Sequence, residues 1–204
     1  MTAGSKSIVR QRQDPLRERY RSAANEAWIK DSARSLSNRE DDPFHGVVIP
    51  GEARDAQWRF GIHQAIGGDH DLPNPGDILC TALVACLDAT LRMIADRLGI
   101  RIESLEVAAT AEVDVRGTLV VDRSVPVGFQ RIGCRVQIQP ADCGDPEKLQ
   151  KLVAAAEYSC VVLQTLRSGV EVRTQFDVSR DDAQRDSETR LEKTRQRIEI
   201  CEPR

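Results

Sequence analysis

The stretch from Pro75 to Leu98 constrains the fold of this 204-residue chain more than any other part. Apolar side chains recur there on nearly every helical turn, from Ile78 to Leu98, so the spacing predicts a helix that is apolar on most of its sides. Gly99 follows, a residue suited to the left-handed end of a helix. A helix of this kind needs protein on several faces, and we expect it to be the central core helix.

Alternation of apolar and polar residues predicts strands at 57–66, 105–115, 132–138 and 170–178. A second long helix is expected from Pro146, with Asp145 as its N-cap, to about Leu166. The strands at 105–115 and 132–138 should pair, with 117–130 as an excursion between them. The order strand, long helix, two strands, long helix, strand favours an α+β fold over a doubly wound nucleotide-binding sheet. The chain also carries no glycine-rich phosphate loop.

Outside this region the sequence predicts an N-terminal extension over 1–50, followed by a domain over 51–179 and a charged tail over 180–204. In the extension, Asp14 and Pro15 favour the start of a helix that runs to about Ser35. Its apolar stripe should cover the body of its own or a partner subunit, and the alternative is a peptide-binding arm. Residues 37–51 are expected to be irregular, and the tail a solvated helix or a disordered segment.

The formal net charge of −3 and the pI near 5.7 argue against nucleic acid and acidic membranes as partners. No secretory signal is seen in residues 1–13, and no segment is expected to reach the roughly 18 apolar residues that cross a bilayer. A cytoplasmic location follows by elimination. The six cysteines contain no CxxC pair and no zinc-ligand spacing, so we expect most thiols to be reduced and no metal to be bound.

One cysteine lies within each of the two long apolar helices, Cys86 in Ala-Cys-Leu-Asp-Ala-Thr and Cys160 in Tyr-Ser-Cys-Val-Val. Together with Asn74-Pro75 at the start of the first helix and the order of elements, this arrangement resembles the osmotically inducible protein C and organic hydroperoxide resistance (OsmC/Ohr) family. The resemblance covers about residues 57–178. It implies an OsmC-like fold with antiparallel sheets, two long central helices and an intertwined homodimer.

The resemblance also implies a chemistry for the two cysteines. Cys86 would attack an organic hydroperoxide and become a sulfenic acid, and Cys160 would resolve it as a disulfide. A thiolate is the reactive species, and a nearby thiol protects a sulfenic acid from further oxidation. No cofactor is implied beyond an external dithiol or thiol-protein reductant.

This chain departs from the family pattern at the glutamate that follows Asn-Pro in the peroxidase members, because Gly76 stands there. Asp77 is the neighbouring candidate to take over the role, although successive helical residues point about 100° apart. The activating arginine that the resemblance implies has two candidates near the first strand, Arg54 and Arg59. The helix dipole alone would favour Cys80 over Cys86, since its effect fades after the first turn.

The other cysteines and the histidines have simpler interpretations. Cys134 occupies an inward position on an alternating strand, and Cys143 and Cys201 resemble loop or tail thiols. The three histidines, His45, His63 and His70, fall in no recognisable constellation.

Three functions remain open from the sequence. The first is a cysteine-based peroxidase. The second is an OsmC-like small-molecule-binding or redox-sensing protein without efficient peroxidase activity, an alternative that Gly76 favours. The third is an interaction protein that uses its N-terminal helix and its tail.

Overall fold

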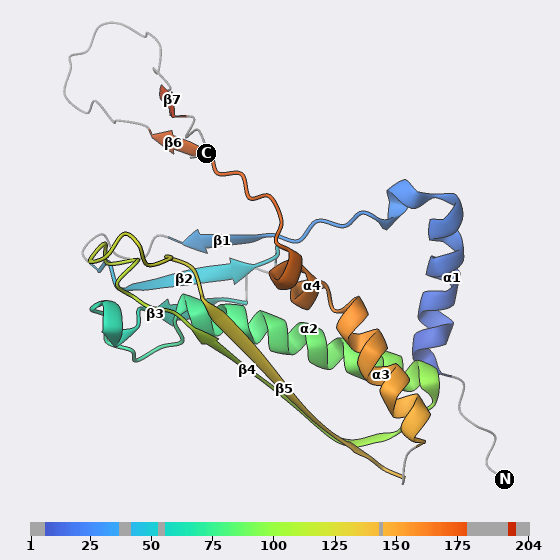
Figure 1. The fold of residues 1–204 in the computed structure, drawn as a ribbon. Helices are drawn as coiled ribbons and strands as arrows, with labels where there is room; N and C mark the ends of the chain where they lie inside the picture. The colour runs from blue at the N-terminus through green and yellow to red at the C-terminus, as the bar shows by residue number, and fades with distance from the viewer. Residues whose placement is uncertain (1–6, 37–41, 53–55, 143–144, 179–195, 199–204) are drawn as a thin grey trace, which may run out of the picture. The chain divides into compact units, whose positions relative to one another are not determined.

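The structure is a computed structural model that describes residues 7–36, 42–52, 56–142, 145–178 and 196–198. It consists of two compact units, residues 1–167 and residues 168–204. All the elements that concern the candidate site belong to the first unit. Figure 1 shows them as a mixture of helices and antiparallel sheets, which confirms the predicted α+β class.

The central helix is α2, Pro75–Leu98, with the bounds that the sequence predicts. The Asn74 side chain accepts hydrogen bonds from the backbone N–H groups of Gly76 and Asp77, and the Asp77 carboxylate accepts one from the Asn74 N–H. These reciprocal bonds form a capping box that fixes the first turn. Gly99 ends the helix at φ 69°, in the left-handed region, as expected.

A long antiparallel ribbon runs along α2 (Figure 1) and consists of β4, Ile102–Glu112, and β5, Arg131–Pro140. The predicted pairing is confirmed, with Ala109 opposite Cys134 in the register. Turns occupy the connection between the two strands. The core lies between α2, the ribbon and helix α3, and its fully buried members include Leu83 and Leu152.

The second predicted helix is broken in the structure. α3, Pro146–Ser159, begins at Asp145 as expected, but it ends before Cys160, and a separate helix α4, Val161–Ser168, follows. Cys160 has an extended backbone, with φ −73° and ψ 106°. Two β-branched residues follow it directly, and such residues are less favourable in a helix.

The N-terminal predictions were wrong in their bounds. α1 spans Ile8–Ser22, with Ser7 as its N-cap and Pro15 inside the helix, and a 3₁₀ turn η1, Ala24–Ala27, follows. Ser7 competes successfully with Asp14 because Asp96 of α2 accepts hydrogen bonds from both its hydroxyl and the Val9 N–H. The predicted apolar stripe is not buried, since Leu16 is 40% exposed and Trp28, beyond the helix, is 87% exposed.

A three-stranded antiparallel sheet replaces the expected irregular segment. It consists of β1, Ala33–Leu36, β2, His45–Pro50, and β3, Trp58–Gly61, and a 3₁₀ turn η2, Gln64–Ile66, follows. β3 is an edge strand, and it is shorter than the predicted 57–66. Val47 and Ile49 of β2 are buried on one face, which explains why this polar segment forms a strand.

In the second unit, β6, Phe176–Val178, pairs antiparallel with β7, Gln196–Ile198. The expected strand at 170–178 is therefore confined to its last residues. A strand also lies within 180–204, where a solvated helix or a disordered segment was expected.

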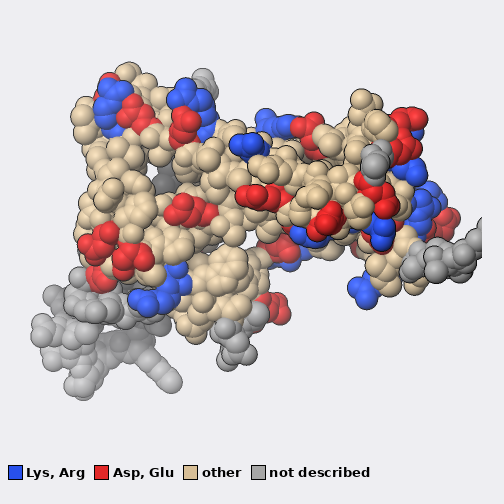
Figure 2. Space-filling view, turned by 90° about the horizontal axis from the view of Figure 1, so that it is seen from below, with Lys and Arg blue, Asp and Glu red and all other residues tan. Residues whose placement is uncertain are grey.

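α2 is, among the described helices, the one that is long and apolar enough to cross a membrane by length and composition. The expectation that no segment would reach this threshold was therefore wrong. Leu83, Leu87 and Leu91 are buried in the core, so we assign α2 as a core helix. On the face in Figure 2, acidic and basic side chains are interspersed.

Candidate thiol site

The structure brings the two predicted cysteines together. Cys86 lies in the middle of α2, at intermediate exposure, and packs against the core cluster that contains Cys160. Cys160, which is 0% exposed, lies between α3 and α4, and its thiol is close enough to that of Cys86 for the Cys86 thiol to raise its pKa. The pair therefore needs no change of fold to come within reach of each other.

The break at Cys160 gives this thiol a distinct environment. Burial raises the pKa of the Cys160 thiol, and the hydrogen bond and charge of Cys86 raise it further. The backbone N–H groups of Leu163 and Val162, in the first turn of α4, act in the opposite direction because they stabilise the thiolate. Burial is the largest cause, so Cys160 is held mainly as the neutral thiol.

Side-chain contacts support the backbone on both sides of the pair. Gln164 of α4 donates a hydrogen bond of 2.6 Å to the carbonyl oxygen of Glu157, which satisfies a carbonyl near the end of α3. In α2, Thr90 Oγ1 donates to the carbonyl oxygen of Cys86 at 2.7 Å. Both cysteines therefore lie on backbone that is held by hydrogen bonds.

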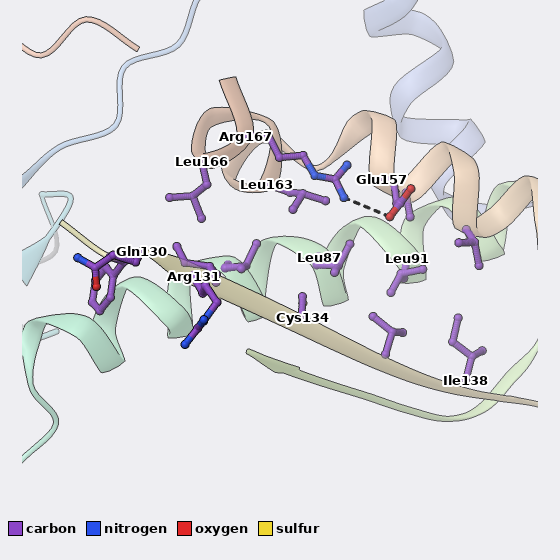
Figure 3. Close-up of a pocket in the computed structure, with 16 residues that line it drawn as sticks. Leu87, Leu91, Gln130, Arg131, Cys134, Ile138, Glu157, Leu163, Leu166 and Arg167 are labelled. Carbon is purple, nitrogen blue, oxygen red and sulfur yellow. Dashed lines mark hydrogen bonds and ion pairs between the residues drawn. The ribbon is translucent and has the colours of Figure 1, made fainter. Parts of the chain in front are cut away.

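A cavity of about 580 Å³ lies beside the pair, between α2, β5, α3 and α4. Figure 3 shows apolar side chains of α2 and α4 directed into it, among them Leu87 and Leu163. Leu87 and Leu163 belong to or pack against the cluster that holds Cys86 and Cys160, whereas neither sulfur is part of the lining. The thiols thus lie behind the apolar wall of the cavity.

The cavity also carries a few polar groups. Arg167 of α4 forms an ion pair of 3.3 Å with Glu157 of α3, drawn as a dashed line in Figure 3. Arg131 at the start of β5 lines the cavity too, and it is paired with Glu112 of β4. Sequence reasoning missed these arginines because the fold alone brings them into the lining of one cavity.

Cys134 lines the cavity, instead of being packed inward as its strand position suggests. The residue as a whole is exposed. Partial burial of the thiol, followed by the charge of the nearby Cys80, raises the pKa of Cys134. Burial, followed by the charge of Asp77, raises the pKa of Cys80. The first-turn dipole therefore does not make Cys80 an activated thiol.

The structure explains Gly76. A Cβ atom on Gly76 would lie 2.9 Å from Asn74 Oδ1 and 3.0 Å from Cζ of Phe129, which leaves no room for a larger side chain. Phe129 belongs to the excursion before β5. The Asp77 carboxylate accepts bonds from the N–H and the side-chain amide of Asn74.

Of the two candidate activating arginines, the structure describes Arg59. Arg59 of β3 is exposed. The pKa of Asp71 is lowered, mainly by a hydrogen bond with His45, and the charge of Arg59 contributes to this shift. Arg54 lies in 53–55, outside the described residues, as do Cys143 and Cys201.

The histidines form local contacts. His45 bridges Asp71 and Asp42, and hydrogen bonds with these two carboxylates, first Asp71, raise its pKa. The rings of His63 and His70 lie edge to face, with their centroids 4.2 Å apart. Within the described ranges, no group of three or more His, Cys, Asp or Glu residues could hold a metal ion.

Comparison with known proteins gives a consistent result. The family model described as OsmC-like protein matches residues 68–175, more than half of the chain. An OsmC-like protein from Mycoplasma pneumoniae is 15% identical, with a TM-score of 0.54 over 69% of this chain and 89% of the other. An OsmC-like protein of unknown function from Vibrio cholerae is 14% identical, with a TM-score of 0.55 over 68% and 94%.

An organic hydroperoxide resistance protein from Elizabethkingia anophelis is 18% identical, with a TM-score of 0.52 over 71% of this chain and 92% of the other. At these identities the likeness concerns the fold. Comparison with curated proteins gives no match.

Proposed function

Because this chain belongs to the family of OsmC-like proteins, we propose that it reduces organic hydroperoxides with its own thiols. The observation that carries the proposal is the adjacent pair of thiols, Cys86 and Cys160, beside an apolar cavity. A hydrophobic cavity of this size suits the organic part of a hydroperoxide. The printed name of a structural neighbour, an organic hydroperoxide resistance protein, agrees with this substrate class.

In the first step, the Cys86 thiolate attacks one peroxide oxygen. A sulfur–oxygen bond forms, the O–O bond breaks, and the alkoxide leaves as an alcohol after taking up a proton. In the second step, Cys160 attacks the sulfenic sulfur, the disulfide forms, and the hydroxyl leaves as water. An external dithiol or thiol protein then reduces the disulfide, so no resident cofactor takes part.

Leu87, which follows Cys86 in α2, is part of the cavity wall. A peroxide in the cavity therefore reaches Cys86 only after this wall moves. Cys86 is assigned as the attacking thiol because it is partly exposed, whereas Cys160 is fully buried. Arg54, Arg59 and Asp77 remain candidates for activating groups, and the cavity adds Arg131 and Arg167 to them.

We also propose that the protein works as a homodimer. Ile132, Val136 and Val153 line the cavity and are 39%, 37% and 48% exposed, so a second subunit that covers this side would bury them. Sedimentation of the full chain tests this. Reduction of the disulfide needs a reducing compartment, and we propose the cytoplasm.

The decisive experiment is titration with cumene hydroperoxide in the presence of a dithiol, followed by mass spectrometry of individual cysteines. The wild-type protein should form a Cys86–Cys160 disulfide and turn over. Cys86→Ser should lose turnover by about a thousandfold or more, while Cys160→Ser should accumulate sulfinic acid at Cys86. Unchanged turnover in Cys86→Ser would rule out the mechanism.

The same titration distinguishes the alternative. One equivalent of peroxide consumed without turnover would indicate a redox-sensing protein, for which the raised pKa of Cys160 and the closed position at Gly76 are the supporting observations. Cys134→Ser is the matched control, because this thiol lies in the cavity wall and outside the pair.

A further inference from the structure

A second groove lies outside the thiol site, between α1 and the C-terminal half of α2. Its volume is about 460 Å³, within the range of small-molecule sites. The helix that closes it, α1, precedes the part of the chain that the family model matches, residues 68–175. The groove is therefore built partly from an element that the family model does not include.

The side of α1 that lines the groove is basic and polar. Arg10, Gln13 and Arg17 recur at three- and four-residue spacing and line it together, whereas the apolar Leu16 is left 40% exposed. A helix on a protein surface normally turns its apolar stripe inward. Val9 and Tyr20 of α1 are only partly exposed, so apolar and cationic side chains of this helix both lie next to the body of the protein.

The positive charges in the groove are only partly balanced. Arg97 of α2 is paired with Asp14 at 2.9 Å. Arg10 donates hydrogen bonds of 3.1 and 2.8 Å to the carbonyl oxygen of Arg97, and Asp96 lies near enough for its pKa to be lowered by Arg10. Arg17 has no hydrogen-bonding or ion-pair partner among the described residues.

The floor of the groove is apolar. Met93, Ile94 and Leu98 of α2 line it, and Ala155 of α3 lines the opposite side. No Asp or Glu belongs to the lining within the described part of the chain. A ligand that matches this surface has an oxyanion for Arg17 and a short apolar tail.

We propose that this groove binds a small amphipathic organic anion, with its head group at Arg17 and its tail over Met93 and Ile94. Carboxylates and phosphate monoesters share this chemistry, since both accept the fork of hydrogen bonds that a guanidinium donates. The site is independent of the proposed thiol chemistry.

Calorimetric titration of the full-length protein tests the proposal with four probes of equal tail length: octanoate, octyl phosphate, octanol and octyltrimethylammonium. At least one anion should bind at one site per chain, and at least tenfold more tightly than octanol or the cation. The tighter of the two anions identifies the head group as carboxylate or phosphate. Equal binding of octanol would overturn the proposal, because the head group would then not be recognised.

Two matched variants locate the site. Arg17→Gln should weaken anion binding by about tenfold or more, since it removes a charged hydrogen bond. Arg12→Gln makes the same charge change on an exposed residue of α1 outside the lining, and it should change binding less than twofold. Equal effects of the two variants, or none from Arg17→Gln, would show that the arginines only cover α2 with their stems.

A third variant tests the tail. Ala155→Leu adds a larger side chain at the groove wall and should abolish binding of the anion, while the arginines stay unchanged. Circular dichroism confirms that the variant is folded. Anion binding that persists in folded Ala155→Leu would place the ligand elsewhere and contradict the proposal.

Discussion

α2 and the pair α3–α4 each contribute one cysteine to the site, but they hold it in opposite ways. Cys86 lies in the interior of one uninterrupted helix of 24 residues. Cys160 lies at a break between helices of 14 and 8 residues, where backbone N–H groups are free to bond its sulfur. Since a helix interior uses its own N–H groups, a thiol there must be tuned by side chains alone.

This difference assigns separate tasks to the two thiols. A neutral, buried Cys160 is protected from peroxide and becomes reactive only when a sulfenic acid forms next to it. Cys86 is the more accessible thiol because its helix borders the cavity.

The largest expected effect on stability is at the contact between α2 and α3. Leu152 of α3 is 0% exposed in the core cluster that also contains Leu87 and Leu91 of α2. Leu152→Ala should lower the free energy of unfolding by about 2–5 kcal/mol, because it leaves a cavity. Urea denaturation measures this. Gln150→Ala, at an exposed position of the same helix, is the control and should cost clearly less.

A smaller effect is expected at the start of α2. Gly76→Glu should destabilise the protein by about 1–3 kcal/mol, since its Cβ would crowd Asn74 and Phe129. Phe129→Ala removes one of these neighbours, so the double variant should be more stable than the sum of the two single effects predicts. Thermal unfolding of the wild type, the two single variants and the double variant gives the coupling energy between positions 76 and 129. Additive effects would mean that Phe129 does not close this position.

The pH dependence should distinguish the two oxidation steps. The pKa of Cys160 is raised, so its thiolate fraction at neutral pH is small, and disulfide closure should accelerate by about tenfold per pH unit until the pH reaches that pKa. The folded state holds this proton more tightly than the unfolded state. Stability should therefore fall as the pH rises from the ordinary thiol pKa through the raised one.

Stopped-flow measurement of thiol loss after a single equivalent of peroxide follows disulfide closure. Cys160→Ser removes that phase and serves as the control. A closure rate that is constant from pH 6 to pH 9 would contradict the raised pKa.

The smallest difference in the free energy of unfolding is expected between variants at the N-caps of α2 and α3. Asn74 forms a reciprocal capping box at α2, whereas Asp145 accepts one bond of 3.0 Å, from the Glu147 N–H, at α3. Asn74→Ala should cost about 1–2 kcal/mol and Asp145→Ala about 0.5–1 kcal/mol. Chemical denaturation of the two variants side by side tests the order, and a larger loss at Asp145 would reverse it.

Local patterns predicted the elements whose signals lie within one segment. The bounds of α2 follow from Asn74, Pro75 and Gly99, and the pairing of β4 with β5 follows from their alternation. The resemblance gave the pair Cys86 and Cys160, and the fold brings the two thiols together.

The errors arose where a distant contact decides the local structure. α1 begins at Ser7 because Asp96, 89 residues later, accepts its hydroxyl hydrogen bond. β2 depends on partners in β1 and β3. The cavity arginines, Arg131 and Arg167, could not be identified for the same reason.

The break at Cys160 affects how substitutions at this position must be read. The sulfur lies close to the backbone N–H groups of Val162 and Leu163, which act to lower its pKa, so it faces the first turn of α4 where an N-cap side chain would lie. Alanine at 160 would remove both the redox group and this acceptor, and lost activity could then reflect a frayed helix. Serine keeps an oxygen acceptor at the same place, and it separates loss of the chemistry from loss of the cap.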